Sequence, residues 1–322
     1  MESDIDVVYT WVDGANPFFS ARFHACLQEF PSPYTGSLGP QRFRDNGELR
    51  YSLRSVEAFA PWLRKFHIVT QGETPRWLDA SDDRISIITH DMIFPDRKFL
   101  PTFNSNAIEL HLHRIPGLSR KFLYFNDDIF LGRTTSVNDF ITASGGQYVY
   151  FHNWPLYSKT DEGLVHDRAY AHTQNLIDRL WGCQHSRLLP AHAPQLYDRE
   201  ILASLEKLIH EEFQVTSSHR FRSPNDLVLR VLYSFFLLEG RDEAGKHKAR
   251  VLKSPRECEF VRLDGHVSGM RRAFLKIRIM RPKFFCINDD IEEATVDQET
   301  LSYLDGFLRS YFQHPSSFER RT

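Results

Sequence analysis

Through residue 126, short apolar runs alternate with segments of helical periodicity. Four runs of strand length are rich in β-branched and aromatic residues, and they lie at 5–12, 65–70, 84–89 and 121–126. Between them, one helix pattern spans 46–63 and ends near Pro61, and a second begins after Ser105 and stops near Pro116. This alternation predicts βαβ units and an α/β fold with a mainly parallel, Rossmann-like sheet.

An acidic pair, Asp127 and Asp128, follows the fourth apolar run in the stretch KFLYFNDDIFLG. Ligands of parallel sheets gather beyond the carboxyl ends of the strands, and Thr10, Trp11 and Asp13 leave the first strand at that same edge. Two like charges at the end of a buried strand repel each other unless a cation or a basic group lies between them. We therefore expect a hard divalent ion, Mg²⁺ or Mn²⁺, bridging the phosphates of a nucleotide. The alternative is a solvated turn or a helix cap.

The same ending recurs near the C-terminus, where FFCINDD at 284–290 repeats the pattern of FLYFNDD at 122–128. We expect Asn288, Asp289 and Asp290 to line the same site. Otherwise they would cap a helix over the following IEEA.

The remaining segments divide by composition. We expect a long loop over the site at 14–45, which is rich in Gly, Pro and Ser. Helices are predicted at 196–213, at 225–240 after Ser223-Pro224, and at 301–313, whereas 241–282 has no clear pattern. We expect an α/β core at 1–150 and a mainly helical portion at 151–322, or one continuous domain.

Charge and cysteine content exclude several classes of protein. A formal net charge of −2 gives no global basic field for nucleic acid. The N-terminus lacks the pattern of a secretory signal, and no window has about 18 apolar residues, so we expect neither a signal nor a transmembrane segment. The four cysteines lack CxxC spacing, which argues against a zinc cluster and favours reduced thiols in a cytosolic enzyme. They are Cys26, Cys183, Cys258 and Cys286.

Among single residues, His192 and Arg222 are candidates for the chemistry. Prolines flank His192 in LLPAHAP and fix an extended loop that would present the imidazole. Arg222 precedes a predicted helix, a position suited to phosphate oxygens. A structural histidine and a surface arginine are the alternatives.

Other charged residues are open to two interpretations. Arg50 and Arg54 share a helix face and would bind a diphosphate or be solvated. Glu109 would be a base or positioning carboxylate, or would pair with His113 four residues later. We expect His111 and His113 to be surface or structural residues, because they lie on different helix faces.

Five segments of the chain form a recognisable set. In chain order they are IDVVYTWVDG, RFRDNGELRYSLRSVEAFAPWLRKFHIVTQGETPRWL, LPTFNSNAIELHLHRIPGLSRKFLYFNDDIFLG, PAHAPQLYDRE and HRFRSPNDL. Together they resemble the Stealth family of hexose-1-phosphate transferases, which includes bacterial capsule polymerases and the catalytic subunit of the lysosomal-enzyme N-acetylglucosamine-1-phosphotransferase. The resemblance implies that 1–150 is a nucleotide-sugar-binding core and 151–322 an acceptor and catalytic portion. The resemblance spans about residues 5 to 290, and its long second block is highly specific.

This resemblance implies a glycosyltransferase-A-like fold whose helical C-terminal part completes the active site. It also implies transfer of hexose- or hexosamine-1-phosphate from a UDP-sugar, such as UDP-GlcNAc, to a hydroxyl of a saccharide or growing polysaccharide. UMP would be released and a phosphodiester formed with Mg²⁺ or Mn²⁺, as in capsule or exopolysaccharide synthesis. Expected catalytic residues are His192, Arg222, Glu109 and Asp127, and expected metal ligands are Asp127, Asp128, Asn288 and Asp289. Expected substrate contacts are Thr10, Trp11, Asp13, Asn46, Arg50, Arg54, Asn104 and Asp226.

The chain also departs from the family pattern. Gln195 stands where relatives often have a second histidine, which argues against a two-histidine mechanism, and Asn225-Asp226 replaces a common Glu-Asp. The cysteine-rich modules of the lysosomal enzyme are absent, so we expect the compact bacterial type, cytoplasmic or peripheral at the inner face of the membrane. His192 would act as general base or as covalent nucleophile. The alternatives in function are a metal-dependent glycosyltransferase that releases UDP and a non-catalytic saccharide-binding protein.

Overall fold

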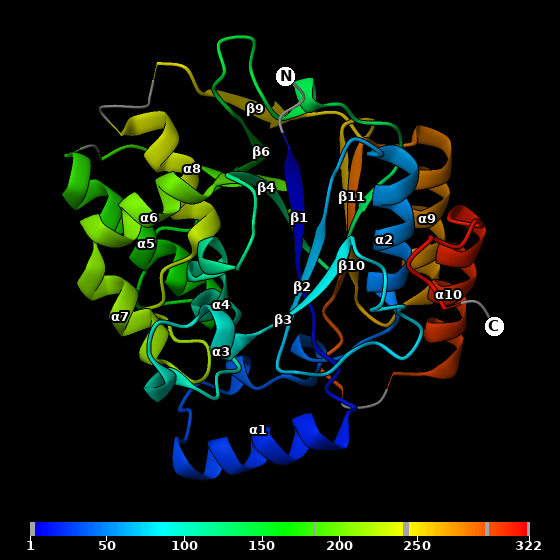
Figure 1. Cartoon of the computed structure of the whole chain (residues 1–322), viewed down its shortest axis with the longest axis horizontal. Helices are drawn as coiled ribbons and strands as arrows, with labels where there is room; N and C mark the ends of the chain where they lie inside the picture. The colour runs from blue at the N-terminus through cyan, green and yellow to red at the C-terminus, as the bar shows by residue number, and fades with distance from the viewer. Residues whose placement is uncertain (1–3, 183, 241–244, 294–295, 321–322) are drawn as a thin grey trace.

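The computed structural model describes residues 4–182, 184–240, 245–293 and 296–320 (Figure 1). A central sheet has the strand order β3-β2-β1-β4-β8. Its strands are β1 (Ile5–Thr10), β2 (Phe66–Thr70), β3 (Ile85–Thr89), β4 (Lys121–Asn126) and β8 (Gln195–Asp198). The first four are parallel, and β8 runs antiparallel to β4. The predicted α/β class and mainly parallel sheet are therefore confirmed.

The strand register places the predicted polar residues at one edge. In the pairing of β1 with β4, Thr10 lies opposite Asn126, so the residues that follow both strands leave the sheet side by side. The apolar positions of β1 and β2 are fully buried, as their β-branched composition predicts. Burial on both faces holds these strand ends in place.

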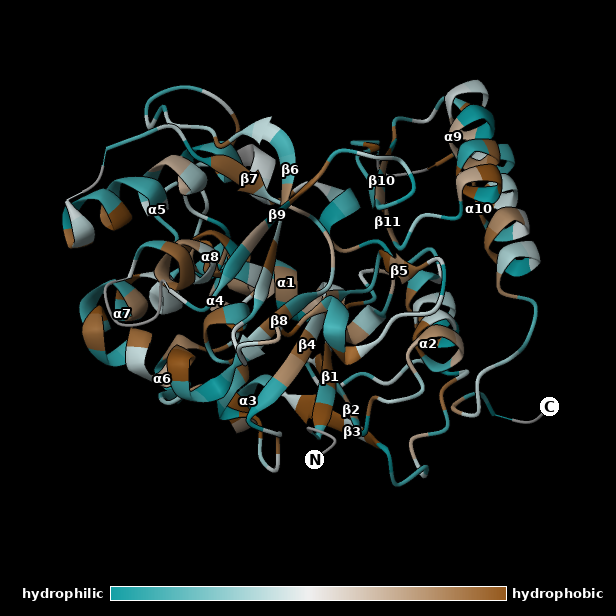
Figure 2. Cartoon of the chain, turned by 90° about the horizontal axis from the view of Figure 1, so that it is seen from above, coloured by the Kyte–Doolittle hydropathy of each residue, from teal (hydrophilic) through white to brown (hydrophobic). Residues whose placement is uncertain are grey.

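Helices cover both faces of the sheet, and Figures 1 and 2 show the same arrangement from two directions. On one side lie α3 (His90–Ile93), α4 (Ser105–Leu110), α5 (Val165–Trp181), α6 (Arg199–Leu208), α7 (His210–Ser218) and α8 (Leu229–Glu239). On the other side lie α2 (Glu48–Phe59), α9 (Val267–Met280) and α10 (Gln298–Tyr311).

The acidic pair occupies a junction between two sheets. After β4 the chain makes a turn at Asp127 and Asp128 and enters β5 (Ile129–Leu131), which belongs to a second sheet of order β10-β11-β5. Its other strands are β10 (Cys258–Leu263) and β11 (Phe284–Asp289). Because β5 pairs with β11, the backbone N–H of Ile287 donates to the carbonyl of Asp128 at 3.0 Å. The two Asn-Asp-Asp segments therefore meet.

A third sheet has the order β7-β6-β9 and is made of β6 (Tyr148–Pro155), β7 (Leu188–Pro190) and β9 (Lys248–Leu252). The boundary expected at residue 150 falls inside β6, and β8 and β11 join strands from the first half of the chain. Of the two divisions considered, we propose the single continuous domain.

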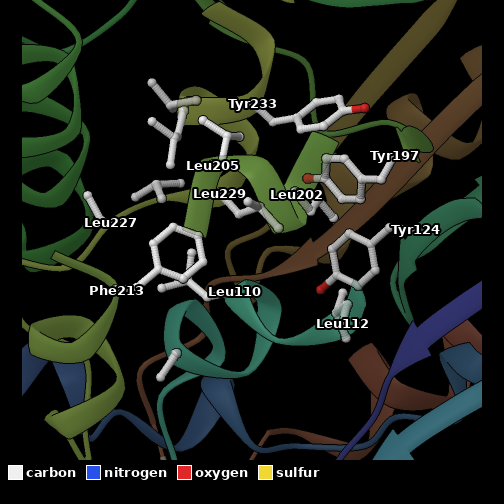
Figure 3. Close-up of a cluster of buried hydrophobic side chains, with 14 of the residues drawn as sticks. Leu110, Leu112, Tyr124, Tyr197, Leu202, Leu205, Phe213, Leu227, Leu229 and Tyr233 are labelled. Carbon is white, nitrogen blue, oxygen red and sulfur yellow. The ribbon is translucent and has the colours of Figure 1, made fainter. Parts of the chain in front are cut away.

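The largest buried cluster joins the sheet to the helices α4 to α8 (Figure 3). Tyr124 of β4 and Tyr197 of β8 stack with their ring centroids 6.1 Å apart, and Tyr197 meets Tyr233 of α8 edge-on at 4.8 Å. This packing fixes the position of α8 against the strand that precedes the acidic pair. The side chains of α8 that face the site are thereby held to the sheet.

Two predictions about elements were wrong. The segment 14–45 contains α1 (Pro17–Glu29), capped by Asn16, whose side chain accepts a hydrogen bond from the N–H of Phe18. Its apolar stripe packs on Phe103 and Phe221, distant residues that no local pattern reveals. The predicted helix at 196–213 is divided into β8, α6 and α7, because the central sheet captures its first residues as an edge strand.

The other C-terminal predictions were closer. The helix predicted at 225–240 begins at Leu229, and the predicted tail helix is α10. The unassigned region contains β9, β10 and α9, with 241–244 outside the described residues. None of the described helices combines the length and the apolar character that crossing a membrane requires.

Candidate active site

A cleft of about 660 Å³ opens over the carboxyl ends of β1 and β4. Both carboxylates and arginines line it. Its acidic residues are Glu48, Glu109, Asp127, Asp128, Asp167, Asp289 and Asp290, and its amide residues are Gln41, Gln71, Asn106, Asn126, Gln195 and Asn288. Its arginines are Arg42, Arg44, Arg222, Arg230 and Arg262.

Asp127 faces other carboxyl groups. Burial raises the pKa of Asp127 well above its usual value, and the nearby Asp128, Glu48 and Asp45 raise it further. Burial, together with Asp45, likewise raises the pKa of Glu48 to about 8. Among the described residues no lysine or arginine pairs with Asp127. Such a group is costly to ionise unless a cation neutralises it, which fits a hard divalent ion.

His192 lies between an arginine and Asp128. Arg230 Nη1 donates to His192 Nδ1 at 2.7 Å, and His192 Nε2 lies 3.3 Å from Asp128 Oδ1. Because a guanidinium only donates hydrogen bonds, Nδ1 is the acceptor. The ring proton is then on Nε2, which donates a hydrogen bond to the carboxylate of Asp128. Burial opposes ionisation of Asp128, but its interactions with His192 outweigh it and lower the pKa. The carboxylate therefore fixes the imidazole in one tautomer.

The second Asn-Asp-Asp segment completes the surroundings of Asp128. Asn288 Nδ2 donates to Asp128 Oδ2 at 3.4 Å, and Cys286 Sγ lies 3.3 Å from the same oxygen. The donor atoms of Asp128, His192 and Cys286 all lie within 4.8 Å of one another. Burial raises the pKa of the Cys286 thiol well above its usual value, so it remains protonated, and oxygen atoms dominate the donors available to a cation.

Two arginines of the cleft lie close to each other. Arg222 Nη2 donates to Ser105 Oγ at 2.7 Å and lines the cleft as predicted. Burial and the nearby Arg222 lower the pKa of Arg42 to about 9. Two like charges brought together in a partly dry cleft favour an anion between them. Glu109 also lines the cleft near Arg230 and Arg222. Burial raises the pKa of Glu109, and these two arginines oppose that shift.

The predicted substrate contacts from the first strand divide into two groups. Thr10 and Trp11 line the cleft, and Thr10 Oγ1 lies 2.9 Å from the Tyr124 hydroxyl. Asp13 is not among the lining residues and accepts a hydrogen bond from the N–H of Ala15.

Asn46 is another predicted substrate contact that does not line the cleft. It donates to Glu48 Oε1 and to Asp289 Oδ2, and so holds two residues that do line it.

Arg50 and Arg54 do not line the cleft, which argues against the predicted diphosphate contact. Both pair with Glu319, with Arg54 Nε 2.6 Å from Oε1 and Arg50 Nε 2.5 Å from Oε2. Arg54 is only 8% exposed. The helix face that carries them is directed at the C-terminal segment, so their role is to hold that segment on α2.

Asn104 and Asp226 are likewise absent from the cleft wall and fully buried. Asn104 Nδ2 donates to Asp226 Oδ2 at 2.9 Å, and Asn104 Oδ1 caps α4 by accepting from the N–H of Asn106. Asp226 also accepts from the N–H of Ser223 and pairs with His219. This network positions the loop that carries Arg222, so these two residues shape the site without facing it.

Three other predicted residues have identifiable partners. Asp289 Oδ2 accepts from Arg44 Nη1 at 2.6 Å, which neutralises the carboxylate and argues against metal ligation. His111 bonds to Ser217 and His113 to Glu206, as their predicted structural roles require. The alternative in which the second Asn-Asp-Asp segment caps a helix over IEEA involves residue 294, which lies outside the described residues. Cys183 also lies outside them. The described cysteines are free thiols.

Sequence reasoning missed Arg42, Arg230 and Glu48. Arg230 stands in a helix that reads as apolar, and a single arginine within such a run was the available signal. Arg42 lies in the segment 14–45, which we predicted as a long loop over the site without singling out any of its residues. Glu48 opens α2 and gives no sign of burial in the sequence, because only the tertiary fold brings it to Asp127.

Family models match this chain in three places: Stealth conserved region 2 over residues 42–149, region 3 over 191–239 and region 4 over 275–322. A capsular polysaccharide phosphotransferase of Actinobacillus suis is 30% identical, and the match covers 97% of this chain and 83% of that protein. The chain belongs to the Stealth family.

Other relatives in the Stealth family are longer. An exopolysaccharide phosphotransferase of Streptomyces coelicolor is 36% identical over 98% of this chain and 52% of its own length. The exopolysaccharide phosphotransferase CpsY of Mycobacterium tuberculosis is 34% identical over 98% of this chain and 58% of its own length. The chain therefore spans about half the length of these curated relatives.

Among solved structures, the galactosyltransferase LgtC is similar with a TM-score of 0.45 and 12% identity, covering 97% of this chain and 98% of that one. The glycosyltransferase GlyE of Streptococcus pneumoniae has a TM-score of 0.41 and 10% identity, covering 99% of this chain and 65% of that one. The fold class of the Stealth chain follows from its own sheet topology and not from these distant likenesses.

Proposed function

We propose that this Stealth chain transfers hexose-1-phosphate or N-acetylhexosamine-1-phosphate from a UDP-sugar, such as UDP-GlcNAc, to a hydroxyl of a saccharide or growing polysaccharide. UMP is the product that leaves, and a phosphodiester is the linkage that forms. The relatives' names as polysaccharide phosphotransferases support this reaction class and a role in capsule or exopolysaccharide synthesis. We further propose a cytoplasmic site of action, with peripheral contact at the inner face of the membrane.

One observation carries the proposal: His192, between Arg230 and Asp128, lies in a cleft that both carboxylates and arginines line. A sugar nucleotide carries its negative charge on the diphosphate, so arginines together with carboxylates that hold a divalent ion suit it. Arg222 and Arg42 would bind the phosphate oxygens. A protein that only bound neutral saccharides would not need a buried carboxyl group such as Asp127, which has no lysine or arginine partner among the described residues.

The acidic group fits Mg²⁺ or Mn²⁺ because Asp127, Glu48 and Asp45 pair with no lysine or arginine among the described residues, while Asp128 pairs with His192. Asp127 and Asp128 would be ligands, with Asn288 beside them. When bound, the ion would neutralise the diphosphate and lower the barrier to departure of UMP.

The chemistry of the chain's own residues follows from His192. Asp128 Oδ1 holds the proton on Nε2, as the carboxylate of a catalytic triad does, and leaves Nδ1 as the basic nitrogen. When a donor binds, Arg230 turns from Nδ1 to the phosphate oxygens, and the acceptor hydroxyl takes its place. The hydroxyl oxygen attacks the phosphorus next to the sugar, its proton passes to Nδ1, and the bond from that phosphorus to the bridging oxygen breaks. Glu109 would position the arginines.

The test is incubation of the chain with a panel of UDP-sugars, a saccharide acceptor mixture and Mg²⁺ or Mn²⁺. Released nucleotide is separated by chromatography, and the product is examined by ³¹P NMR. We expect UMP and a phosphodiester signal. Release of UDP with a phosphorus-free linkage would instead indicate a glycosyltransferase, and no turnover with any UDP-sugar would contradict the enzyme assignment.

A further inference from the structure

An aromatic surface lies beside His192 at the wall of the cleft. We call it the aromatic ledge, and it consists of His152 and Trp154 of β6 and Phe260 of β10. Trp154 lines the cleft and is 48% exposed. A large aromatic ring left open to solvent in a cleft forgoes the burial that tryptophan normally gains, which indicates a surface that a ligand covers.

Neighbouring rings fix the orientation of Trp154. Its ring stacks on His152 with the centroids 4.3 Å apart and an interplanar angle of 18°, and it meets the edge of Phe260 at 6.1 Å and 88°. The stacked His152 covers one face of the indole, while Trp154 itself stays 48% exposed and lines the cleft. A flat surface held in this way binds at little cost in side-chain entropy.

The aromatic ledge is also tied to His192. The backbone N–H of His192 donates to His152 Nε2 at 3.1 Å, and the His192 ring lies 6.1 Å from the ring of Phe260. Trp154 and His192 therefore both lie beside Phe260, each with its ring centroid 6.1 Å from that of Phe260.

We propose that the exposed face of Trp154 is the acceptor subsite, where it stacks on the pyranose ring of the saccharide that accepts the sugar phosphate. This proposal rests on the proposed function. One face of a pyranose presents C–H groups, which the electron-rich face of an indole attracts, while the ring hydroxyls at the edge remain free to react. A hydroxyl of the stacked sugar would thus reach His192.

A uracil base could also stack on an indole, but the strand order argues for the acceptor. The aromatic ledge lies near the His192 loop, which leads into β8 at one edge of the central sheet. Gln71 and His90, which also line the cleft, follow β2 and β3 at the other edge. Asp127 and Asp128, the proposed metal ligands, follow β4 and lie between these two edges. A donor with its base near β2 would therefore direct its sugar phosphate toward the aromatic ledge.

Binding can be tested without turnover by labelling the indole nitrogens of the whole chain with ¹⁵N. The signal of Trp154 is identified by its loss in Trp154→Phe. Methyl glucopyranoside, galactopyranoside, mannopyranoside and N-acetylglucosaminide are then titrated, with glycerol as the polyol control and UDP with Mg²⁺ as the nucleotide control. We expect at least one pyranoside to shift the Trp154 signal, and neither control to do so.

A second measurement uses transfer to the pyranoside that binds. Trp154→Ala should raise the KM for this acceptor about 3- to 10-fold and leave the donor KM within about twofold, whereas Trp154→Phe should retain most of the acceptor affinity. Leu275→Ala, which removes a side chain 57% exposed on α9, is the matched control and should change neither.

The outcomes separate the two proposals. A Trp154 signal that no pyranoside shifts, or that only UDP shifts, would overturn the acceptor subsite. A pyranoside-induced shift in a protein that releases no UMP would support the subsite while contradicting the proposed reaction.

Discussion

His192 is held at three points: Arg230 at Nδ1, Asp128 at Nε2 and His152 at its backbone N–H. None of these partners lies within 30 residues of it in the chain. Its tautomer and orientation are therefore properties of the assembled cleft. A carboxylate that holds the Nε2 proton leaves the lone pair on Nδ1, which a general base and a covalent nucleophile both require, so experiment separates the two mechanisms.

His192→Ala should lower kcat by a factor of about 10² to 10⁴, because a positioned acid–base group contributes that much, while the donor Kd stays within a few fold. The kcat is measured from UMP release and the donor Kd by calorimetry. Retained wild-type turnover would refute the base assignment. Donor labelled at the phosphate next to the sugar should leave no acid-labile label on the protein when acceptor is omitted, and a trapped phosphohistidine would favour the covalent mechanism.

Arg230→Lys should lower kcat about 10-fold or more, because an ammonium cannot reproduce the planar fork that contacts His192 and the Tyr170 hydroxyl before the donor binds and the phosphate oxygens afterwards. The matched control is Arg262→Lys, on the same cleft wall but paired with Asp290. The pH profiles of kcat and kcat/KM distinguish a role in orienting His192 from a general loss of structure. If both substitutions lower kcat equally with unchanged profiles, Arg230 has no special role.

At the scale of elements, the turn between β4 and β5 decides the site. Through this turn the chain passes from the central sheet to the second sheet, and the turn places Asp127 and Asp128 next to β11. A comparable tie joins α2 to the C-terminal segment through Arg54 and Glu319. Burial opposes ionisation of Glu319, but hydrogen bonds from Arg54 and the backbone outweigh it and lower its pKa to about 2.

Arg54→Ala should destabilise the fold by about 3 kcal/mol, because it leaves Glu319 buried without its main partner. Arg50→Ala, whose side chain is 40% exposed, should cost about 1 kcal/mol or less. Urea unfolding gives both values, and donor affinity of the folded protein should not change. A stable Arg54→Ala variant that has lost donor binding would restore the diphosphate role expected from the sequence.

The pH dependence of this tie has a definite sign. Since the folded pKa of Glu319 lies below its ordinary value of 4.5, its contribution to stability is complete above pH 4.5 and is lost as the pH falls toward 2. The advantage of wild type over Arg54→Ala should therefore shrink in acid.

At the scale of the whole molecule, the carboxyl groups that gather in the cleft oppose the stability of the metal-free protein. Glu48 has its folded pKa at about 8, above the ordinary 4.5, so the stability it contributes is fully present below pH 4.5 and is lost as the pH rises toward 8. Asp127 acts in the same direction. A divalent ion would favour the ionised forms and reverse the loss.

In EDTA, Glu48→Gln should be more stable relative to wild type at pH 8 than at pH 5. The difference should grow by at most about 1.4 kcal/mol for each pH unit between the two pKa values. Mn²⁺ should raise the melting temperature of wild type more at pH 8 than at pH 6. Thermal unfolding with and without the ion measures both effects. Equal slopes for the two proteins in EDTA would refute the buried acidic group.

The sequence alone determined the parallel α/β core and the position of the acidic pair, because strand and helix periodicity and the end of an apolar run are local properties. It also pointed to His192, Arg222 and the second Asn-Asp-Asp segment, all of which line the cleft. Only the tertiary structure decided the partners: Arg230 at His192, Glu48 at Asp127 and Glu319 at Arg54. Partners so distant in the chain meet through packing of the sheets and helices, and whether a charge faces a ligand or another side chain depends on that packing.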